Sequence, residues 1–201
     1  NRTFFAPHDV DYGITRFQTL SDAAIPSQIK VLLSENGLKL FKKTYFGHFL
    51  SLPKICIQNQ AIHLLMKYEL NASGSNFFTG EIKGEMLNFG LREFALITGL
   101  RCFTEVTNFG YTTKYDSKII RSYFSNKKKV EKSYLKKIVT SRSWVNDEDA
   151  VKLCILYLIE FFLCPSDKDN LGLIDHFRFY LVDSGQYANN AWGIEAYTQL
   201  L

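Results

Sequence analysis

The chain has 201 residues, of which 46% are hydrophobic and 22% are charged, and this composition excludes an intrinsically disordered protein. Aromatic side chains make up 15% of the residues and supply bulk for a core. The most apolar stretch, Val151–Cys164, contains Lys152 and Glu160 and is shorter than the roughly 20 apolar residues that span a bilayer, so we expect no membrane segment.

Residues 1–20 lack clean periodicity, and we predict an N-terminal arm over 1–16 followed by one domain over 17–201. Helical spacing of apolar residues recurs through most of that domain. The predicted fold class is therefore mainly α, a single compact multi-helix domain with a minor β-hairpin. Because the chain starts with Asn1 rather than Met, we expect it to be a domain cut from a longer protein.

The first predicted helices are short. Pro26 in a first turn predicts a helix that ends at Gly37, and a second helical pattern ends near Gly47. Apolar residues at helical spacing then predict a mostly buried helix over about 58–70.

A hairpin and a short helix are predicted next. The apolar runs at Phe77-Phe78 and Met86–Phe89 predict the two strands of the hairpin. Gly90 opens a helix, Gly99 closes it, and the spacing between them predicts that one face, which includes Ile97, is buried.

The net positive charge of the chain is concentrated in residues 114–142. They contain ten of the 24 Lys and Arg residues against two acids, a formal charge of +8, whereas the rest of the chain carries 14 basic and 18 acidic residues, a charge of −4. A cationic patch on a mildly acidic body indicates an anionic partner. The segment is predicted to form two helices, about 116–125 and 130–141.

The candidate nucleic-acid-binding residues are basic side chains on and between these two predicted helices: Lys127, Lys128, Lys129, Lys132, Lys136, Lys137 and Arg142. Phosphate contacts need only cations, and nearby aromatic rings such as Tyr134 could stack on unpaired bases. The alternative is a solvated rim of lysines over aromatic residues that belong to the core. Charge runs usually mark solvated faces, which favours that alternative.

Three further helices follow. Asn146 before Asp147, Glu148 and Asp149 is the strongest helix start in the chain, because an N-cap amide and acids in the first turn both suit the positive end of the helix dipole. This helix is predicted to run to Cys164 and to be stopped by Pro165. Apolar residues at helical spacing between 171 and 181 predict another helix, and Trp192 begins the last.

No arrangement of side chains predicts an enzyme. The four cysteines and four histidines lack the spacing of a metal site or a catalytic pair, and the calcium-loop-like stretch 167–178 has Arg178 where a bidentate Glu is required. We predict no catalytic residue, no metal and no cofactor. Three cysteines have apolar neighbours, typical of buried thiols in a reducing compartment. With Lys127–Lys129 and Lys132, which faintly resemble a nuclear-import patch, this predicts an intracellular, nuclear location.

Several blocks of the sequence resemble a known family. Phe46–Leu52 (FGHFLSL) is similar to a block written FGHLLDL, and Leu91–Cys102 (LREFALITGLRC) to the most characteristic block of that family. Leu156–Glu160 and the end from Ala191, similar to a segment written PWG, follow in the same order. The family is the plant domain of unknown function numbered nineteen eighty-five. The resemblance spans about residues 17–201.

The resemblance implies a context rather than a reaction. Members of the family often lie upstream of a Ulp-type SUMO-protease domain in plant transposon-derived proteins, and no catalytic residues come with the domain itself. Three hypotheses stay open: a non-catalytic module that recruits or positions a protein partner, a nucleic-acid-binding module acting through 114–142, and an accessory domain of a protease whose catalytic domain lies outside this chain.

Overall fold

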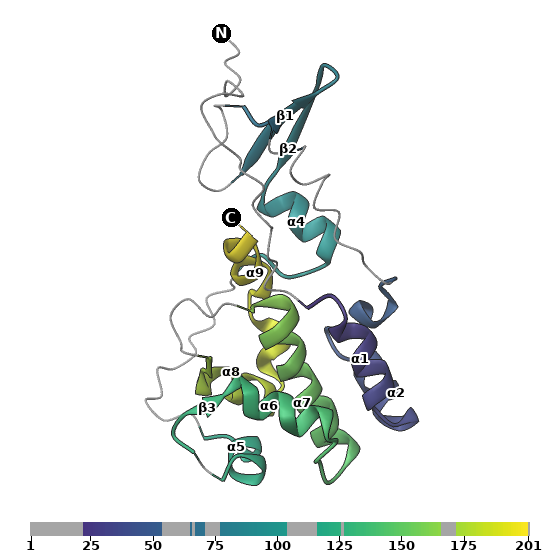
Figure 1. The fold of residues 1–201 in the computed structure, drawn as a ribbon, viewed down its shortest axis with the longest axis vertical. Coiled ribbons are helices and arrows are strands. Elements are labelled where there is room, and N and C mark those ends of the chain that lie inside the picture. The colour runs from purple at the N-terminus through teal and green to yellow at the C-terminus, as the bar shows by residue number, and fades with distance from the viewer. Residues whose placement is uncertain are drawn as a thin grey trace. The chain divides into compact units, whose positions relative to one another are not determined.

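The structure is a computed structural model (Figure 1), and it describes residues 22–53, 65, 67–70, 77–103, 116–125, 127–165 and 172–200. These residues are mainly helical with two short antiparallel strand pairs, which confirms the predicted fold class. They form two compact units: unit 1 comprises the described parts of 56–104 and 191–201, and unit 2 those of 20–55 and 105–190. The division into an arm over 1–16 and one domain over 17–201 stays a prediction.

The hairpin of unit 1 is formed by β1 (Phe78–Ile82) and β2 (Glu85–Phe89), which pair antiparallel with Phe78 opposite Phe89. The two-residue turn has positive φ at both Lys83 (52°) and Gly84 (85°). A turn with positive φ at both central residues matches the right-handed twist of the two strands that it joins. This confirms the predicted hairpin. The helix predicted over 58–70 lies mostly outside the described residues, and its end is wrong, because Glu69 pairs with Gly80 of β1.

Two helices complete the described part of unit 1. Helix α4 (Leu91–Thr98) begins where the Gly90 N–H donates to Glu93 Oε2 at 2.9 Å, and it ends at Gly99 with φ of 68°. Helix α9 (Trp192–Leu200) packs on α4, with the Tyr197 ring 5.4 Å from that of Phe94. Both helices confirm the sequence prediction.

The N-terminal part of unit 2 contains α1 (Ile25–Leu32), α2 (Glu35–Lys42) and the short 3-10 helix η1 (Gly47–Ser51). The prediction that the first helix continues to Gly37 is wrong. Ser34 begins a new helix by accepting a hydrogen bond from the Gly37 N–H at 2.9 Å, so Gly37 lies in the first turn of α2. An N-cap hydroxyl satisfies a backbone donor that the helix itself cannot, and here that cap decides the boundary.

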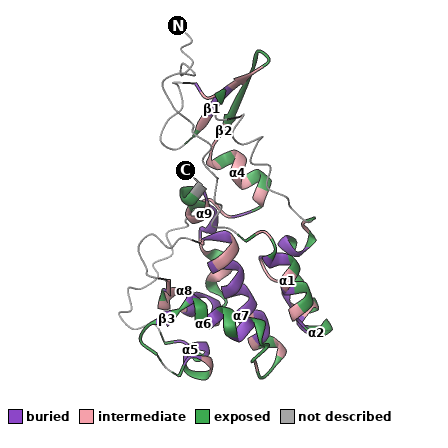
Figure 2. Ribbon diagram, in the orientation of Figure 1, coloured by how far each residue is buried: buried purple, intermediate pink, exposed green. Residues whose placement is uncertain are grey.

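Helix α7 (Asp147–Leu158) is the centre of unit 2, and Figure 2 shows it as largely buried. It packs against α1 and α2, against α6 (Lys132–Thr140), which precedes it in the chain, and against α8 (His176–Asp183), which follows it. Asn146 caps it by accepting from the Asp149 N–H at 2.8 Å, as predicted. The helix continues into the π-helical turn η2 (Ile159–Leu163), which ends before Pro165.

The basic segment forms α5 (Lys118–Tyr123), the short strand β3 (Val130–Glu131) and α6, which confirms two helices in this region. Strand β3 pairs with β4 (Leu173–Ile174). The prediction of a helix from 171 is wrong at its start, because Ile174 is in a strand. Asp175 then caps α8 by accepting from the Phe177 N–H at 2.9 Å. The short helix η3 (Gln186–Asn189) follows.

None of the helices among the described residues has the length and apolar content needed to cross a membrane.

Candidate functional site

Five of the basic side chains singled out in the sequence are exposed on unit 2. We call them the lysine surface, and its members are Lys127, Lys128, Lys129, Lys136 and Lys137. Among the residues that the structure describes, no carboxylate forms an ion pair with any of the five. Their charges therefore face solvent without compensation from a described acid.

The segment that carries three of these lysines is held at several points along its backbone. The Lys127 N–H donates to the Phe124 carbonyl at 3.0 Å, and Val130, 1% exposed, pairs with Ile174 of β4. The Lys132 N–H donates to the Gly172 carbonyl at 2.7 Å. Since both ends of the run are tied to a packed body, the lysines belong to a defined surface rather than to a charged tail.

An aromatic ring accompanies the lysines. Tyr134, in the first turn of α6, is 37% exposed, and Lys127 Nζ lies over its ring at 4.7 Å from the centroid. The ring packs against Phe124 with centroids 5.6 Å apart, and Phe124 is fully buried. Lys137 follows Tyr134 at the i+3 position, so both side chains are on the same side of α6.

Lys132, also expected to contact phosphate, belongs to the interior instead. Its residue is 8% exposed, and its Nζ lies 3.4 Å from Glu160 Oε2. Glu160 is 1% exposed and also accepts a hydrogen bond from Arg178 Nη1 at 2.7 Å. Lys132, Leu135 and Val139 share the face of α6 that packs on unit 2, and Lys137 lies on another face. Lys136, one turn after Lys132, lies over the Phe161 ring at 5.9 Å and stays exposed.

Arg142 is exposed but has a local partner. Its guanidinium Nη2 donates to the Val31 carbonyl at 2.8 Å, in the last turn of α1. A cation at the C-terminal end of a helix satisfies an unpaired carbonyl and suits the helix dipole. The guanidinium of Arg142 therefore ties the turn after α6 to α1.

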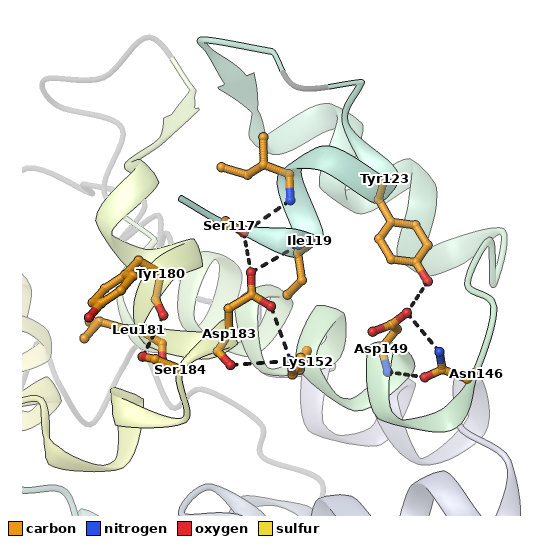
Figure 3. A network of polar contacts seen from close by, with 11 residues as sticks. Ser117, Ile119, Tyr123, Asn146, Asp149, Lys152, Tyr180, Leu181, Asp183 and Ser184 are labelled. Atoms are coloured by element: carbon orange, nitrogen blue, oxygen red, sulfur yellow. Dashed lines mark hydrogen bonds and ion pairs between the residues drawn. The ribbon is translucent and has the colours of Figure 1, made fainter. Parts of the chain in front are cut away.

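Helix α5, which precedes the lysine run, is fixed by the carboxylate of Asp183 (Figure 3). Ser117 Oγ and the Ile119 N–H both donate to Asp183 Oδ2, the second at 3.1 Å. Lys152 Nζ of α7 lies 3.3 Å from Asp183 Oδ1. One carboxylate, 12% exposed at its side chain, thus joins α5, α7 and α8.

A second group in Figure 3 joins the end of α5 to the start of α7. Tyr123 Oη donates to Asp149 Oδ2 at 2.7 Å and accepts from the Val145 N–H at 3.1 Å. Burial raises the pKa of the Tyr123 phenol, the Val145 hydrogen bond lowers it, and the hydrogen bond to Asp149 and the charge of that carboxylate raise it further, so the net shift is upward. Asn146 Nδ2 also donates to Asp149. The sequence predicts Asn146 as a cap, but it carries no local signal for the contact between Tyr123 and Asp149, which are 26 residues apart.

Cys154 is fully buried in α7. Burial raises the pKa of the Cys154 thiol to about 12, so this sulfur is not a thiolate at neutral pH. No set of three His, Cys, Asp or Glu side chains within the described ranges is placed to hold a metal ion.

Unit 1 exposes several large apolar side chains. On α4, Leu96 is 76% exposed and Ile97 is 75% exposed, and on β2 Met86 is 49% exposed. The prediction of a buried face that includes Ile97 is wrong. Helix α4 has only eight residues, and its contacts with β2 and α9 leave it without a buried residue; Phe94 is half-buried and Ile97 is open.

Comparison with known proteins adds one finding. A family model described as Domain of unknown function (DUF1985) matches residues 68–201. The matched range covers α4, the lysine surface and the C-terminal Trp192-Gly193 pair. No curated protein and no solved structure matches the chain.

Proposed function

We propose that this chain, which belongs to the family Domain of unknown function (DUF1985), is a non-catalytic binding module that binds nucleic acid through the lysine surface. The observation that carries the proposal is the anchored run Lys127–Lys129, with Lys127 over the Tyr134 ring and Lys137 on the same side of α6 as that ring. These lysines and Lys136, which lies over the Phe161 ring, are exposed and form no ion pair with a described carboxylate. Binding to a phosphate backbone needs several cations on one rigid surface, and the release of condensed counterions supplies much of the affinity.

Charge arrangement around the surface supports this assignment. Two acids that could offset the lysines form ion pairs elsewhere: Asp116 with Arg121, and the buried Glu160 with Lys132 and Arg178. Glu131 is exposed and accepts from Ser133 Oγ at 3.0 Å, so it keeps its charge and is the one acid within the basic run Lys127–Lys137. At physiological ionic strength fields are screened within about 8 Å, so uncompensated cations on one surface act together on a nearby backbone.

The test is a salt series of binding to a short DNA duplex and to a single strand, measured by fluorescence anisotropy. Each phosphate contact contributes about −0.9 to the slope of log K against log salt on duplex DNA and about −0.7 on single strands. The triple variant Lys128→Glu, Lys129→Glu, Lys137→Glu should weaken binding and flatten the slope by about 2 to 3.

The matched control reverses three other exposed lysines of unit 2, Lys30, Lys42 and Lys43, and makes the same change in net charge. If both triple variants bind alike, net charge rather than the lysine surface controls binding and the proposal fails. Binding by the wild-type chain that does not respond to salt would also contradict it.

A second candidate function, recruitment of a protein partner, is favoured by the exposed Leu96 and Ile97 of α4. Such side chains cluster at protein interfaces when they form part of an apolar patch. A purified partner that binds the wild-type chain should lose affinity for the variant Leu96→Ser, Ile97→Ser. The control is Val31→Ser, which removes a side chain of similar exposure, 72%, from unit 2.

A further inference from the structure

Tyr134 is placed differently from the other large aromatic residues of its surroundings. Phe124 and Phe179 are fully buried and meet edge to face at 5.3 Å, whereas Tyr134 packs on Phe124 and stays 37% exposed. The buried pair prevents the Tyr134 ring from turning inward. Its ring is therefore a supported, partly exposed aromatic side chain next to Lys127 and on the same side of α6 as Lys137.

The cations lie where the phosphates of a stacked nucleotide would need them. Lys127 Nζ is 4.7 Å from the Tyr134 ring centroid, and Lys137 is one helical turn further along α6. A base that stacks on an aromatic ring brings its own phosphates within reach of side chains around that ring. Lysine side chains are long enough to follow those phosphates while the ring holds the base.

In the unbound chain, Lys127 occupies part of the space over the ring. A cation over an aromatic ring at an exposed site changes an equilibrium by about 2- to 5-fold. Stacking of a base on an aromatic side chain is worth about 5- to 150-fold in affinity. Stacking therefore outweighs the contact that it displaces, and the released ammonium becomes available to a phosphate.

We propose that the lysine surface selects single-stranded over duplex nucleic acid, because Tyr134 stacks on an unpaired base while the surrounding lysines contact the backbone. This inference rests on the proposed function. In a duplex the bases are already stacked and paired, so Tyr134 gains nothing there, and only the lysines contribute to binding.

The experiment measures anisotropy of labelled oligonucleotides of equal length in three forms: single-stranded, duplex, and single-stranded with abasic sites throughout. Tyr134→Ala should weaken binding to the normal single strand by about 5- to 150-fold. It should leave the salt slope, the duplex affinity and the abasic affinity unchanged. Tyr134→Phe keeps the ring and should retain single-strand binding.

Because Tyr134 also packs on Phe124, Tyr134→Leu provides a variant that keeps an apolar contact but lacks an aromatic face. It should behave as Tyr134→Ala does, and thermal unfolding of all three variants checks that unit 2 remains folded. A loss of affinity that is equal on abasic and normal strands would show a structural effect and overturn the stacking role.

The outcomes separate the two proposals. If single strand and duplex both bind in a salt-dependent way and the Tyr134 variants bind them as tightly as the wild type does, the stacking inference is overturned and nucleic-acid binding stays in place. Absence of salt-dependent binding to every oligonucleotide overturns both. Polyglutamate that binds as tightly as single-stranded DNA, with no effect of Tyr134, would identify the surface as one for acidic peptides and also overturn the inference.

Discussion

Arg178 donates a hydrogen bond to Glu160 at 2.7 Å, and the Glu160 carboxylate it meets is 1% exposed. The π-helical turn η2 carries Glu160, while α8 carries Arg178. Lys132 of α6 contacts the other carboxylate oxygen at 3.4 Å. A single buried anion thus links three elements of unit 2 through two cations, which explains why Lys132 is absent from the lysine surface.

Removing Arg178 should destabilise the chain severely. Arg178→Ala leaves Glu160 buried with only Lys132 as its charged partner in the described part of the chain, and loss of one partner of a buried ion pair costs about 3–5 kcal/mol. Urea denaturation measures the change in free energy of unfolding. Arg121→Ala, which breaks the exposed pair with Asp116, is the control and should cost less than about 1 kcal/mol. Equal losses in the two variants would contradict the assignment.

Asp147 should contribute to stability in a pH-dependent way. Ser34 Oγ and Asn36 Nδ2 donate to its two carboxylate oxygens at 2.6 and 2.7 Å, and these hydrogen bonds hold the pKa of Asp147 below its ordinary value of 3.8. Because the pKa is lower in the folded state, the contribution is fully present above the unfolded pKa and is lost as pH falls through the folded one.

The measurement is the free energy of unfolding in urea from neutral pH down to about pH 2.5. Asp147→Asn should reduce the difference between neutral and acidic stability, and Asn36→Ala should reduce it partly. Glu148→Gln, on the next residue of the same helix and exposed, serves as the control. If the free energy of unfolding falls equally toward acidic pH in the wild type and in Asp147→Asn, these hydrogen bonds do not stabilise the ionised carboxylate in the folded state.

The chain should lose stability at high pH as the buried Tyr157 phenol ionises. Its residue is fully buried, its hydroxyl donates to Gln28 Oε1 at 3.0 Å, and burial, with the charge of Asp22, raises its pKa to about 12 from 10.0. The folded pKa is above the unfolded one, so the stabilising contribution is present below pH 10 and is lost as pH rises through about 12.

Tyr157→Phe should lower stability at neutral pH by about 1 kcal/mol, because Gln28 loses its hydrogen-bond donor. It should also weaken the decline at alkaline pH, which urea denaturation at about pH 8 to 11 measures. Tyr68→Phe, at a side chain 40% exposed, should change neither quantity. An alkaline decline as steep in Tyr157→Phe as in the wild type would contradict the prediction.

Gly193 should not tolerate a side chain. A Cβ atom at this position would collide with Cys102 Sγ and lie 2.8 Å from the Arg101 carbonyl oxygen. Gly193→Ala should therefore destabilise unit 1 by about 1–3 kcal/mol, measured by thermal unfolding. The control is Gly90→Ala, where the nearest atoms are 3.4 Å and 3.6 Å away.

A double variant separates the two collisions at Gly193. Adding Cys102→Ala removes the sulfur but not the Arg101 carbonyl, so the two substitutions together should cost less than the sum of their separate effects. If the stability losses of Gly193→Ala and Cys102→Ala simply add in the double variant, the strain arises at the Arg101 carbonyl and not at the Cys102 sulfur.

The sequence predicted helix ends best where a single residue decides them. Asn146 supplies an N-cap and Gly99 accepts the left-handed backbone, and both act within one turn of chain, so local chemistry is enough to locate them. Gly37 was misplaced because the cap that starts α2 is Ser34, and a glycine is compatible with either end of a helix.

The number and position of the charged residues could be taken from the sequence, but whether each one is buried, paired or exposed could not. Lys132 and Lys136 are four residues apart in one basic run, yet one meets buried Glu160 and the other is exposed. They lie one turn apart on the same side of α6, so the difference comes from what each turn meets: the Glu160 carboxylate beside Lys132, and the Phe161 ring, whose centroid is 5.9 Å from Lys136 Nζ, beside Lys136. Asp183, which fixes α5, had no sequence signal at all, since Ser117 and Ile119 are more than 60 residues away from it.

By itself the sequence determined the mainly α class, the hairpin and the concentration of positive charge between 114 and 142, because periodicity, turn residues and charge counts are local properties. Only the tertiary structure decided that Lys132 and Arg142 serve the fold, that five lysines and the Tyr134 ring face solvent, and that Leu96 and Ile97 are uncovered. Burial and ion pairing depend on neighbours distant in the chain, and no local pattern specifies which elements those neighbours come from.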